Sequence, residues 1–339
     1  MEEQRDLCFN DILLVPQYSE LGSRTLPSVE TKVGHITLNA PLISAPMDSI
    51  TGKYMLLVMD KLGGLGILSR HINLPDDEEL KMQISEIKWA RNEGANNVGC
   101  AIGIKGDVYD KACSLLDSGC NVICIDVAHG DHKKVYEAID ELMRLKGSNQ
   151  FVIMAGNVCT DSAVRAFVKH GVDAIKVGIG PGAACTTRLV TGFGRGQLSA
   201  IQDACSADFA KYAVGVSIIA DGGLRTSGDM VKALWAGADA CMIGYMLAGT
   251  NATPRIDGKK VYRGMSSRAA SGRPDIAPEG IEIQMGDRGE TEEVVLEYIK
   301  GLRSGLAMGG ALNLSELRTN VTHVTVSPLS MEETNPKSN

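Results

Sequence analysis

The chain of 339 residues has few aromatic residues, no excess of basic charge and no long apolar run. Aromatic residues make up only 4% of it, which suggests tight backbone turns rather than large aromatic pockets. Its 34 lysines and arginines and 41 aspartates and glutamates give a formal net charge of −7. We expect no general nucleic-acid binding, which needs a basic face. No apolar stretch reaches the roughly 18 residues of a membrane span, so we expect no membrane partner either.

Several common sequence signals are also missing. The nine cysteines are scattered without a Cys-x-x-Cys pair, and the N-terminal MEEQRDLCFND is charged and has no apolar h-region. A reduced, cytoplasmic compartment is the simplest interpretation. There is no H-E-x-x-H motif, no paired histidine and cysteine spacing and no Walker motif, so we expect no transition-metal site.

What the chain does have is a balance of 44% hydrophobic and 22% charged residues, which is typical of a folded globular protein. Short apolar runs rich in Val and Ile recur along it, most with glycine or an acidic residue close behind. Continuous rather than alternating runs are typical of parallel strands buried on both faces. These runs cover residues 41–45, 65–68, 97–103, 121–128, 151–157, 173–180, 216–223 and 238–245.

Stretches with helical spacing lie between most of these runs, and Gly171 and Gly237 stand where helix C-caps belong. Strand and helix units repeated over about 250 residues predict a (β/α)8 TIM barrel. A doubly wound open sheet is the alternative, but no G-x-G-x-x-G follows the first strand. We expect a single barrel domain over residues 1–325, a polar tail over 326–339 and no inserted second domain. The helical stretches are Tyr109–Leu116, Lys133–Leu145, Ser162–Val168 and Ser227–Trp235.

Two long segments, 181–215 and 251–293, interrupt the rhythm of strands and helices. Each follows the carboxyl end of a strand, so in a barrel both lie on the face where barrel enzymes carry out their chemistry.

The first of these segments is preceded by alternating glycines and contains a cysteine with polar neighbours. Gly178, Gly180 and Gly182 can turn carbonyls or amides inward to hold a cation or a phosphate. Cys185 follows, with Thr186, Thr187 and Arg188 after it. Backbone dipoles and a nearby cation favour the nucleophilic thiolate. A buried structural cysteine is the alternative, but the glycine loop and the polar neighbours favour a reactive one.

Glycines also follow the last two predicted strands. Asp221, Gly222 and Gly223 end the seventh strand, and Gly244 ends the eighth. Each pair alone is weak evidence, because glycine also ends strands for steric reasons. Together they match the phosphate site that recurs in barrels. The phosphate is expected to belong to a substrate, because the dinucleotide fingerprint is missing.

Other polar residues end strands on the same face. Asp126, Asn157 and Asp48 can donate or accept hydrogen bonds there, and His129 is either at the barrel mouth or a solvated loop residue.

With these residues and motifs, the chain resembles the inosine-monophosphate dehydrogenase and guanosine-monophosphate reductase family. The matching motifs keep the family order and cover nearly the whole chain. They are LCFNDILLVP (7–16), APMDSIT (45–51), AGNV (155–158), KVGIGPGAACTTR (176–188), GQLSA (196–200), ADGGLRTSGD (220–229), YRGMSS (262–267) and PEGIE (278–282).

The resemblance implies a purine nucleotide whose C2 is attacked by Cys185, giving a covalent thioimidate-type intermediate. It implies that Asp221 binds the ribose. The phosphate would be surrounded by Gly222, Gly223, Gly244, Tyr245 and Tyr262. The other implied substrate contacts are Ser44, Met47, Gly264, Met265 and Ser266.

The resemblance also implies a nicotinamide dinucleotide, a monovalent cation and a homotetramer. The cofactor would lie near Asp126, Val127, Ala128, Asn157, Gly178 and Gly180. The cation, potassium, would be held by Gly180, Gly182, Cys185 and Arg188.

Within the family, this chain resembles the reductases more than the dehydrogenases. Family dehydrogenases commonly carry a pair of CBS modules inserted after the second strand, and this chain has no such insertion there. Between Met265 and Pro278 there is no tyrosine, and Pro274 follows Arg273, so the Arg-Tyr pair with which dehydrogenases activate water is missing. Thr187 and Glu279 resemble the reductase pair that handles the proton of the departing ammonia.

The resemblance therefore implies NADPH-dependent conversion of GMP to IMP and ammonia by Cys185, Thr187 and Glu279. IMP dehydrogenase acting with NAD is the first alternative, because APMDSIT and GGLGILSRH are more dehydrogenase-like. The others are XMP reductase and a nucleotide-binding barrel without catalysis, since Ala183 replaces a usual serine and the segment after Met265 is short.

Overall fold

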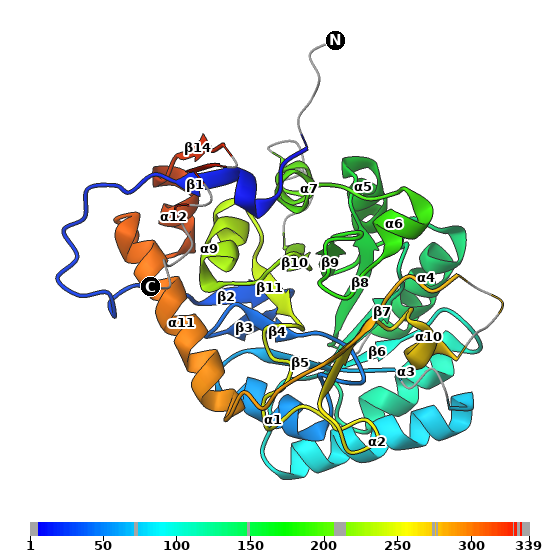
Figure 1. The fold of residues 1–339 in the computed structure, drawn as a ribbon. Coiled ribbons are helices and arrows are strands. Elements are labelled where there is room, and N and C mark those ends of the chain that lie inside the picture. The colour runs from blue at the N-terminus through cyan, green and yellow to red at the C-terminus, as the bar shows by residue number, and fades with distance from the viewer. Residues whose placement is uncertain are drawn as a thin grey trace.

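The protein is described here by a computed structural model that covers residues 6–70, 74–147, 150–206, 215–272, 275, 277–327, 329–330 and 333. Eight parallel strands close into a barrel in the order β10-β11-β4-β5-β6-β7-β8-β9, with helices around the outside (Figure 1). Each of the eight apolar runs forms one of these strands, so the predicted TIM barrel is confirmed. They are β4 (Leu42–Ser44), β5 (Leu65–Leu68), β6 (Val98–Ile102), β7 (Val122–Asp126), β8 (Val152–Val158), β9 (Ala174–Val177), β10 (Ser217–Asp221) and β11 (Ala240–Ile243).

The strands are buried on both faces because each of them contributes to two apolar layers. Along β7, Val122 and Cys124 belong to the cluster that fills the barrel. Ile123 and Ile125 belong to the layer between the strands and the surrounding helices. Successive side chains of a strand point to opposite faces, so a strand covered on both sides must be apolar throughout.

The helices lie where the sequence predicts them, within two residues. α3 (Val108–Asp117), α4 (Lys133–Lys146), α5 (Asp161–Lys169) and α9 (Ser227–Trp235) match the four helical stretches. Gly171 and Gly237 directly follow the C-caps of α5 and α9, with φ of 85° and 119°. The other helices of the barrel are α1 (Lys53–Lys61), α2 (Asp76–Asn92), α11 (Thr291–Met308) and α12 (Leu314–Asn320).

The two long segments contain more regular structure than the sequence pattern indicates. Segment 181–215 includes the short α6 (Thr187–Thr191) and also α7 (Gln197–Ala204), which packs on β9 and β10 as the helix of its own barrel unit. Segment 251–293 includes α10 (Arg268–Ser271) and the antiparallel pair β12 (Val261–Arg263) and β13 (Glu282–Gln284). Three-residue strands leave no periodicity, and their pairing is not local, so neither was predictable.

The opposite end of the barrel is closed by a hairpin. β2 (Thr31–Val33) and β3 (Ile36–Leu38) pair antiparallel, and Val33, Ile36 and Leu38 join the cluster inside the barrel. The carboxyl ends of the barrel strands are therefore the end that remains for a ligand.

A strand near the start of the chain pairs with one near its end beside the barrel. β1 (Ile12–Leu14), which follows the 3-10 turn Phe9–Asp11, pairs antiparallel with β14 (His323–Thr325) (Figure 1). Most of the predicted tail, 326–339, lies outside the described residues. Among the described helices, none is long and apolar enough to cross a membrane.

Candidate functional site

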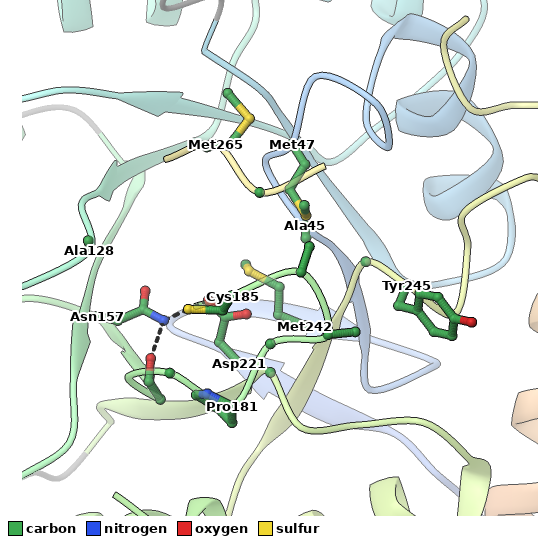
Figure 2. Close-up of a pocket in the computed structure, with 18 of the residues that line it drawn as sticks. Ala45, Met47, Ala128, Asn157, Pro181, Cys185, Asp221, Met242, Tyr245 and Met265 are labelled. Atoms are coloured by element: carbon green, nitrogen blue, oxygen red, sulfur yellow. Dashed lines mark hydrogen bonds between the residues drawn. The ribbon is translucent and has the colours of Figure 1, made fainter. Parts of the chain in front are cut away.

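A cavity opens at the carboxyl ends of the barrel strands and gathers nearly all the predicted site residues (Figure 2). In that view Cys185, Asn157 and Asp221 lie across the space from Met47 and Met265. The predicted residues that line the cavity are Met47, Asp126, Val127, Ala128, Asn157, Gly178, Gly180, Gly182, Cys185, Thr187, Asp221, Gly222, Gly223, Gly244, Tyr245, Tyr262, Gly264, Met265, Ser266 and Glu279.

A chain of hydrogen bonds runs from the cysteine to an acid. The thiol of Cys185 donates to Thr187 Oγ1 at 3.2 Å, and the Thr187 hydroxyl donates to Glu279 Oε2 at 2.7 Å. Cys185 is only partly buried. The arrangement can move a proton between the sulfur and the carboxylate through one hydroxyl, which is what general acid–base catalysis beside a nucleophile requires.

The backbone holds the two segments of this chain together. The amide of Thr186 donates to the Glu279 carbonyl at 3.0 Å, and the amide of Ile281 donates to the Ala184 carbonyl at 3.0 Å. Gly280 makes the close approach possible, because a Cβ there would meet the Ala184 oxygen and the Cα of Gly264 at 3.2 Å. The geometry of this hydrogen-bond chain is thus set by backbone pairing rather than by side-chain freedom.

A second network lies deeper in the cavity and is built around a lysine. Lys176 in β9 has 1% of its surface exposed, and its ammonium is ion-paired with Asp126 and lies 3.4 Å from Asp221 Oδ2. The amide of Asn157 donates to the Gly178 carbonyl at 2.8 Å and to Asp221 Oδ2 at 2.9 Å (Figure 2). Burial alone would lower the pKa of Lys176, but Asp126 and Asp221 outweigh it and hold that pKa above its ordinary value.

Glycines and tyrosines form the end of the cavity predicted for a phosphate. Gly222 and Gly223 have φ of 92° and 78°, in the left-handed region that glycine adopts without strain, and successive amides in such a turn can face an anion. Tyr262 is buried and contacts Tyr245 edge to face at 5.4 Å between ring centres. Burial, followed by the charge of Asp221, raises the pKa of the Tyr262 hydroxyl, so it stays protonated and able to donate a hydrogen bond. Ala183 lines the cavity and offers no hydroxyl.

Two predicted site residues do not line the cavity. Ser44 is fully buried in β4, and its Oγ accepts a hydrogen bond from Thr51 at 2.9 Å. The guanidinium of Arg188 donates to the Arg195 carbonyl, and its side chain packs where Gly180 has no Cβ. Neither Ser44, implied by the resemblance, nor the side chain of Arg188, which follows Cys185 closely in sequence, therefore faces this cavity. His129 does not line the cavity either. It is exposed, which agrees with the alternative that it is a solvated loop residue.

The residues predicted to hold a cation would offer backbone carbonyls. The Gly182 carbonyl accepts from the Cys185 amide at 3.0 Å, and the Arg188 carbonyl accepts from the Gly192 amide at 3.1 Å. Gly180 and Cys185 have carbonyls to which none of the described residues donates a hydrogen bond. A carbonyl oxygen that accepts one hydrogen bond keeps a second lone pair, so these contacts leave all four carbonyls able to ligate a cation.

A second cavity adjoins the first on the side of α2 and α3. The two share Arg70, Val127, Met265, Ser266 and Glu279, so the acid of the hydrogen-bond chain faces both. The second cavity is lined by the charged side chains of Asp76, Glu79, Lys105 and Lys111. Such a lining suits a polar, elongated ligand that reaches across both cavities. Arg273, one of the residues compared with the dehydrogenase pair, lies outside the described residues.

Among the cavity-lining residues that sequence reasoning missed, three carry a charge: Lys176, Arg70 and Arg225. The signal for Lys176 was present, since a lysine inside a strand buried on both faces must have a carboxylate partner. Arg70 and Arg225 follow strands β5 and β10 and carried no comparable signal.

Comparison with known proteins agrees with this geometry. The family described as IMP dehydrogenase / GMP reductase domain matches residues 6–337. The chain belongs to this family. Members of it are oxidoreductases acting on purine nucleotides, so that class of activity applies here, and the resemblance read from the motifs is confirmed.

Two relatives and one solved structure illustrate the likeness. The inosine-5'-monophosphate dehydrogenase of Cryptosporidium parvum is 35% identical over 385 residues, covering 97% of this chain and 94% of that protein. That of Nitrosopumilus maritimus is 28% identical, covering 99% of each. A GMP reductase variant from Trypanosoma brucei, crystallised with guanosine 5'-monophosphate, has a TM-score of 0.88 at 25% identity, covering 100% of this chain and 99% of that one.

Beside the cavity, a buried ion pair holds the family motif after β4 to β12, and it yields a first prediction. Arg263 donates to both oxygens of Asp48, at distances from 2.5 to 3.2 Å, and both residues are less than 10% exposed. Asp48→Ala leaves the buried guanidinium with Glu282, 3.4 Å away and 40% exposed, as its remaining acidic partner. It should lower the free energy of unfolding by about 3 kcal/mol in urea denaturation.

The matched control is the apolar double variant Asp48→Leu with Arg263→Met, which leaves no buried charge unpaired and should unfold at higher urea than Asp48→Ala. A single variant as stable as the parent would contradict this account of the pair.

Proposed function

We propose that this oxidoreductase is a GMP reductase, which uses NADPH to convert GMP to IMP and ammonia. The observation that carries the proposal is the hydrogen-bond chain Cys185–Thr187–Glu279, at 3.2 and 2.7 Å. It joins a nucleophile to an acid that can protonate a leaving amine. The sequence between Met265 and Pro278 also contains no tyrosine to pair with an arginine and activate water.

Cys185, Thr187 and Glu279 account for the bond changes and the proton transfers of the deamination. The proton of Cys185 passes through Thr187 to Glu279, and the sulfur forms a bond to C2 of the purine. The C2–N bond breaks, and the 2-amino group leaves as ammonia with a proton returned along the same chain. The covalent thioimidate left on Cys185 then accepts a hydride at C2, the Sγ–C2 bond breaks to release IMP, and the departing thiolate takes up a proton from water to restore the thiol.

The groups expected around the reactants follow the walls of the two cavities. Asp221 accepts hydrogen bonds from the ribose of the nucleotide, while Gly222, Gly223, Gly244 and Tyr262 donate to its phosphate. Met47, Tyr245, Gly264, Met265 and Ser266 complete the wall around the nucleotide. Asp126, Val127, Ala128, Asn157, Gly178 and Gly180 face the cofactor. NADPH, when bound, supplies the hydride.

A bound potassium ion and a homotetramer remain predictions from the resemblance. The carbonyls of Gly180 and Cys185, to which none of the described residues donates a hydrogen bond, are the ligands most open to such an ion.

IMP dehydrogenase, acting on IMP with NAD, is the second candidate. It is favoured by the names of the two relatives described above, which are both inosine-5'-monophosphate dehydrogenases and match nearly the whole chain. XMP reductase has no specific observation in its favour. The barrel without catalysis is favoured by Ala183 and the short segment after Met265, but the intact chain Cys185–Thr187–Glu279 weighs against it.

Three mixtures of the purified protein test the proposal: NADPH with GMP, NADPH with XMP, and NAD with IMP, each followed by the absorbance of reduced nicotinamide. We expect the signal to fall with GMP and to stay constant in the other two. A rise with IMP and NAD would make the protein a dehydrogenase. A fall with XMP alone would make it an XMP reductase, and no change in any mixture would reject all three reactions.

Cys185→Ala should abolish turnover of GMP while the protein still binds GMP, because the alanine removes the nucleophile but none of the groups that hold ribose and phosphate. Isothermal titration calorimetry gives the binding and the coupled absorbance assay gives the turnover. Cys241→Ala is the matched control, since that thiol is fully buried in β11. If Cys185→Ala turned over near the parental rate, covalent chemistry would be the wrong mechanism.

Glu279→Gln and Thr187→Val each interrupt the proton path without removing the sulfur. We expect GMP deamination to slow by about 10²–10⁴-fold, the usual contribution of general acid–base catalysis, with little change in the affinity for GMP. Glu292→Gln, an exposed substitution in the first turn of α11, serves as the control. Equal losses of affinity and turnover would assign these residues to binding alone.

A further inference from the structure

Lys176 connects two carboxylates that come from different strands and face the cavity. Its ammonium is paired with Asp126 at the end of β7 and lies 3.4 Å from Asp221 at the end of β10. The lysine itself is 1% exposed, whereas the two aspartate side chains are 19% and 21% exposed. The charges are therefore arranged with the cation at the bottom and the anions at the surface that a ligand would touch.

Each carboxylate keeps one oxygen for a ligand. Lys176 donates to Oδ1 of Asp126, and both Lys176 and Asn157 donate to Oδ2 of Asp221. None of the described residues donates a hydrogen bond to Oδ2 of Asp126 or to Oδ1 of Asp221. Ionised carboxylates are strong acceptors for hydroxyl groups, and a ribose carries a diol that can donate to one of them.

A purely structural role does not account for this arrangement. A buried lysine needs a counter-charge, but one carboxylate is enough to supply it. Here a second carboxylate is held within the reach of the same ammonium, and two like charges so close together repel each other unless a cation lies between them. The cost of bringing the two anions together is offset only if both are needed as acceptors.

We propose that Lys176 is a positioning residue that holds Asp221 and Asp126 together as ionised acceptors for two different diols, that of the nucleotide and that of the dinucleotide cofactor. The inference rests on the proposed function, because it takes the second diol from the nicotinamide cofactor. When both ligands exclude water from the cavity, the ammonium is the group that still compensates the two negative charges.

Lys176→Met tests this by removing the charge and keeping much of the side-chain volume. The three groups then carry −2 instead of −1, and the carboxylates repel each other. We expect the affinities for GMP and for NADPH both to fall by about tenfold or more, measured separately by calorimetry and by NADPH fluorescence. Lys61→Met, an exposed lysine at the end of α1, is the matched control and should bind both ligands like the parent.

Charge compensation separates positioning from mere packing. Adding Asp126→Asn to Lys176→Met restores −1 and should recover the affinity for GMP, but not that for NADPH. A side chain needed only for packing would show no such selective recovery. Unchanged affinities in Lys176→Met, a loss for one ligand alone, or no recovery of GMP binding in the double variant would each overturn the proposal.

Two further measurements keep the outcome decisive. If Lys176→Met does not fold, Asp126→Asn alone should weaken NADPH binding while GMP binding is retained, and equal effects on both ligands would reject the inference. A parent protein that binds neither GMP nor IMP would reject the proposed function instead, which distinguishes the two failures.

Discussion

The hydrogen bond from Thr187 to Glu279 joins residues 92 positions apart, and the chemistry of the cavity depends on it. It exists because the segment after β9 and the segment after β12 pair through their backbones, with Gly264 and Gly280 allowing the close contact. Neither segment contains a catalytic unit by itself. One supplies a nucleophile without a base, and the other supplies an acid without a reaction to assist.

The barrel could be predicted from the sequence because its strands are buried on both faces. That burial leaves a local pattern, a continuous apolar run, which repeats eight times, mostly with a glycine or an acidic residue close behind. The pairs β1–β14 and β12–β13 follow from contacts between distant segments, and each strand has three residues. No local pattern encodes such pairing, so the region that contains β12 and β13 was expected only as the long segment 251–293.

The site was predictable to the extent that its residues terminate strands. Gly178, Asp221 and Gly244 reach the cavity for that reason. Ser44 was expected only from the family resemblance, and its hydroxyl accepts a hydrogen bond from Thr51 inside the protein. Arg188 shows the complementary limit, since the turn into α6 directs its guanidinium to the Arg195 carbonyl. Lys176 could have been found by asking which partner a lysine inside an apolar strand must have. Side-chain direction, rather than residue type, was the missing information.

Dehydrogenase and reductase chemistry share the covalent bond between sulfur and C2, so the cysteine cannot discriminate between them. What discriminates is the group that controls the next proton. Hydrolysis needs a base that activates water, whereas deamination needs an acid beside the leaving amine. Glu279 lines both cavities and reaches the sulfur through a single hydroxyl. In the proposed reaction this position would let the acid protonate the leaving amine. It would also set the acid between the nucleotide and a cofactor in the second cavity, where ammonia would depart before C2 accepts a hydride.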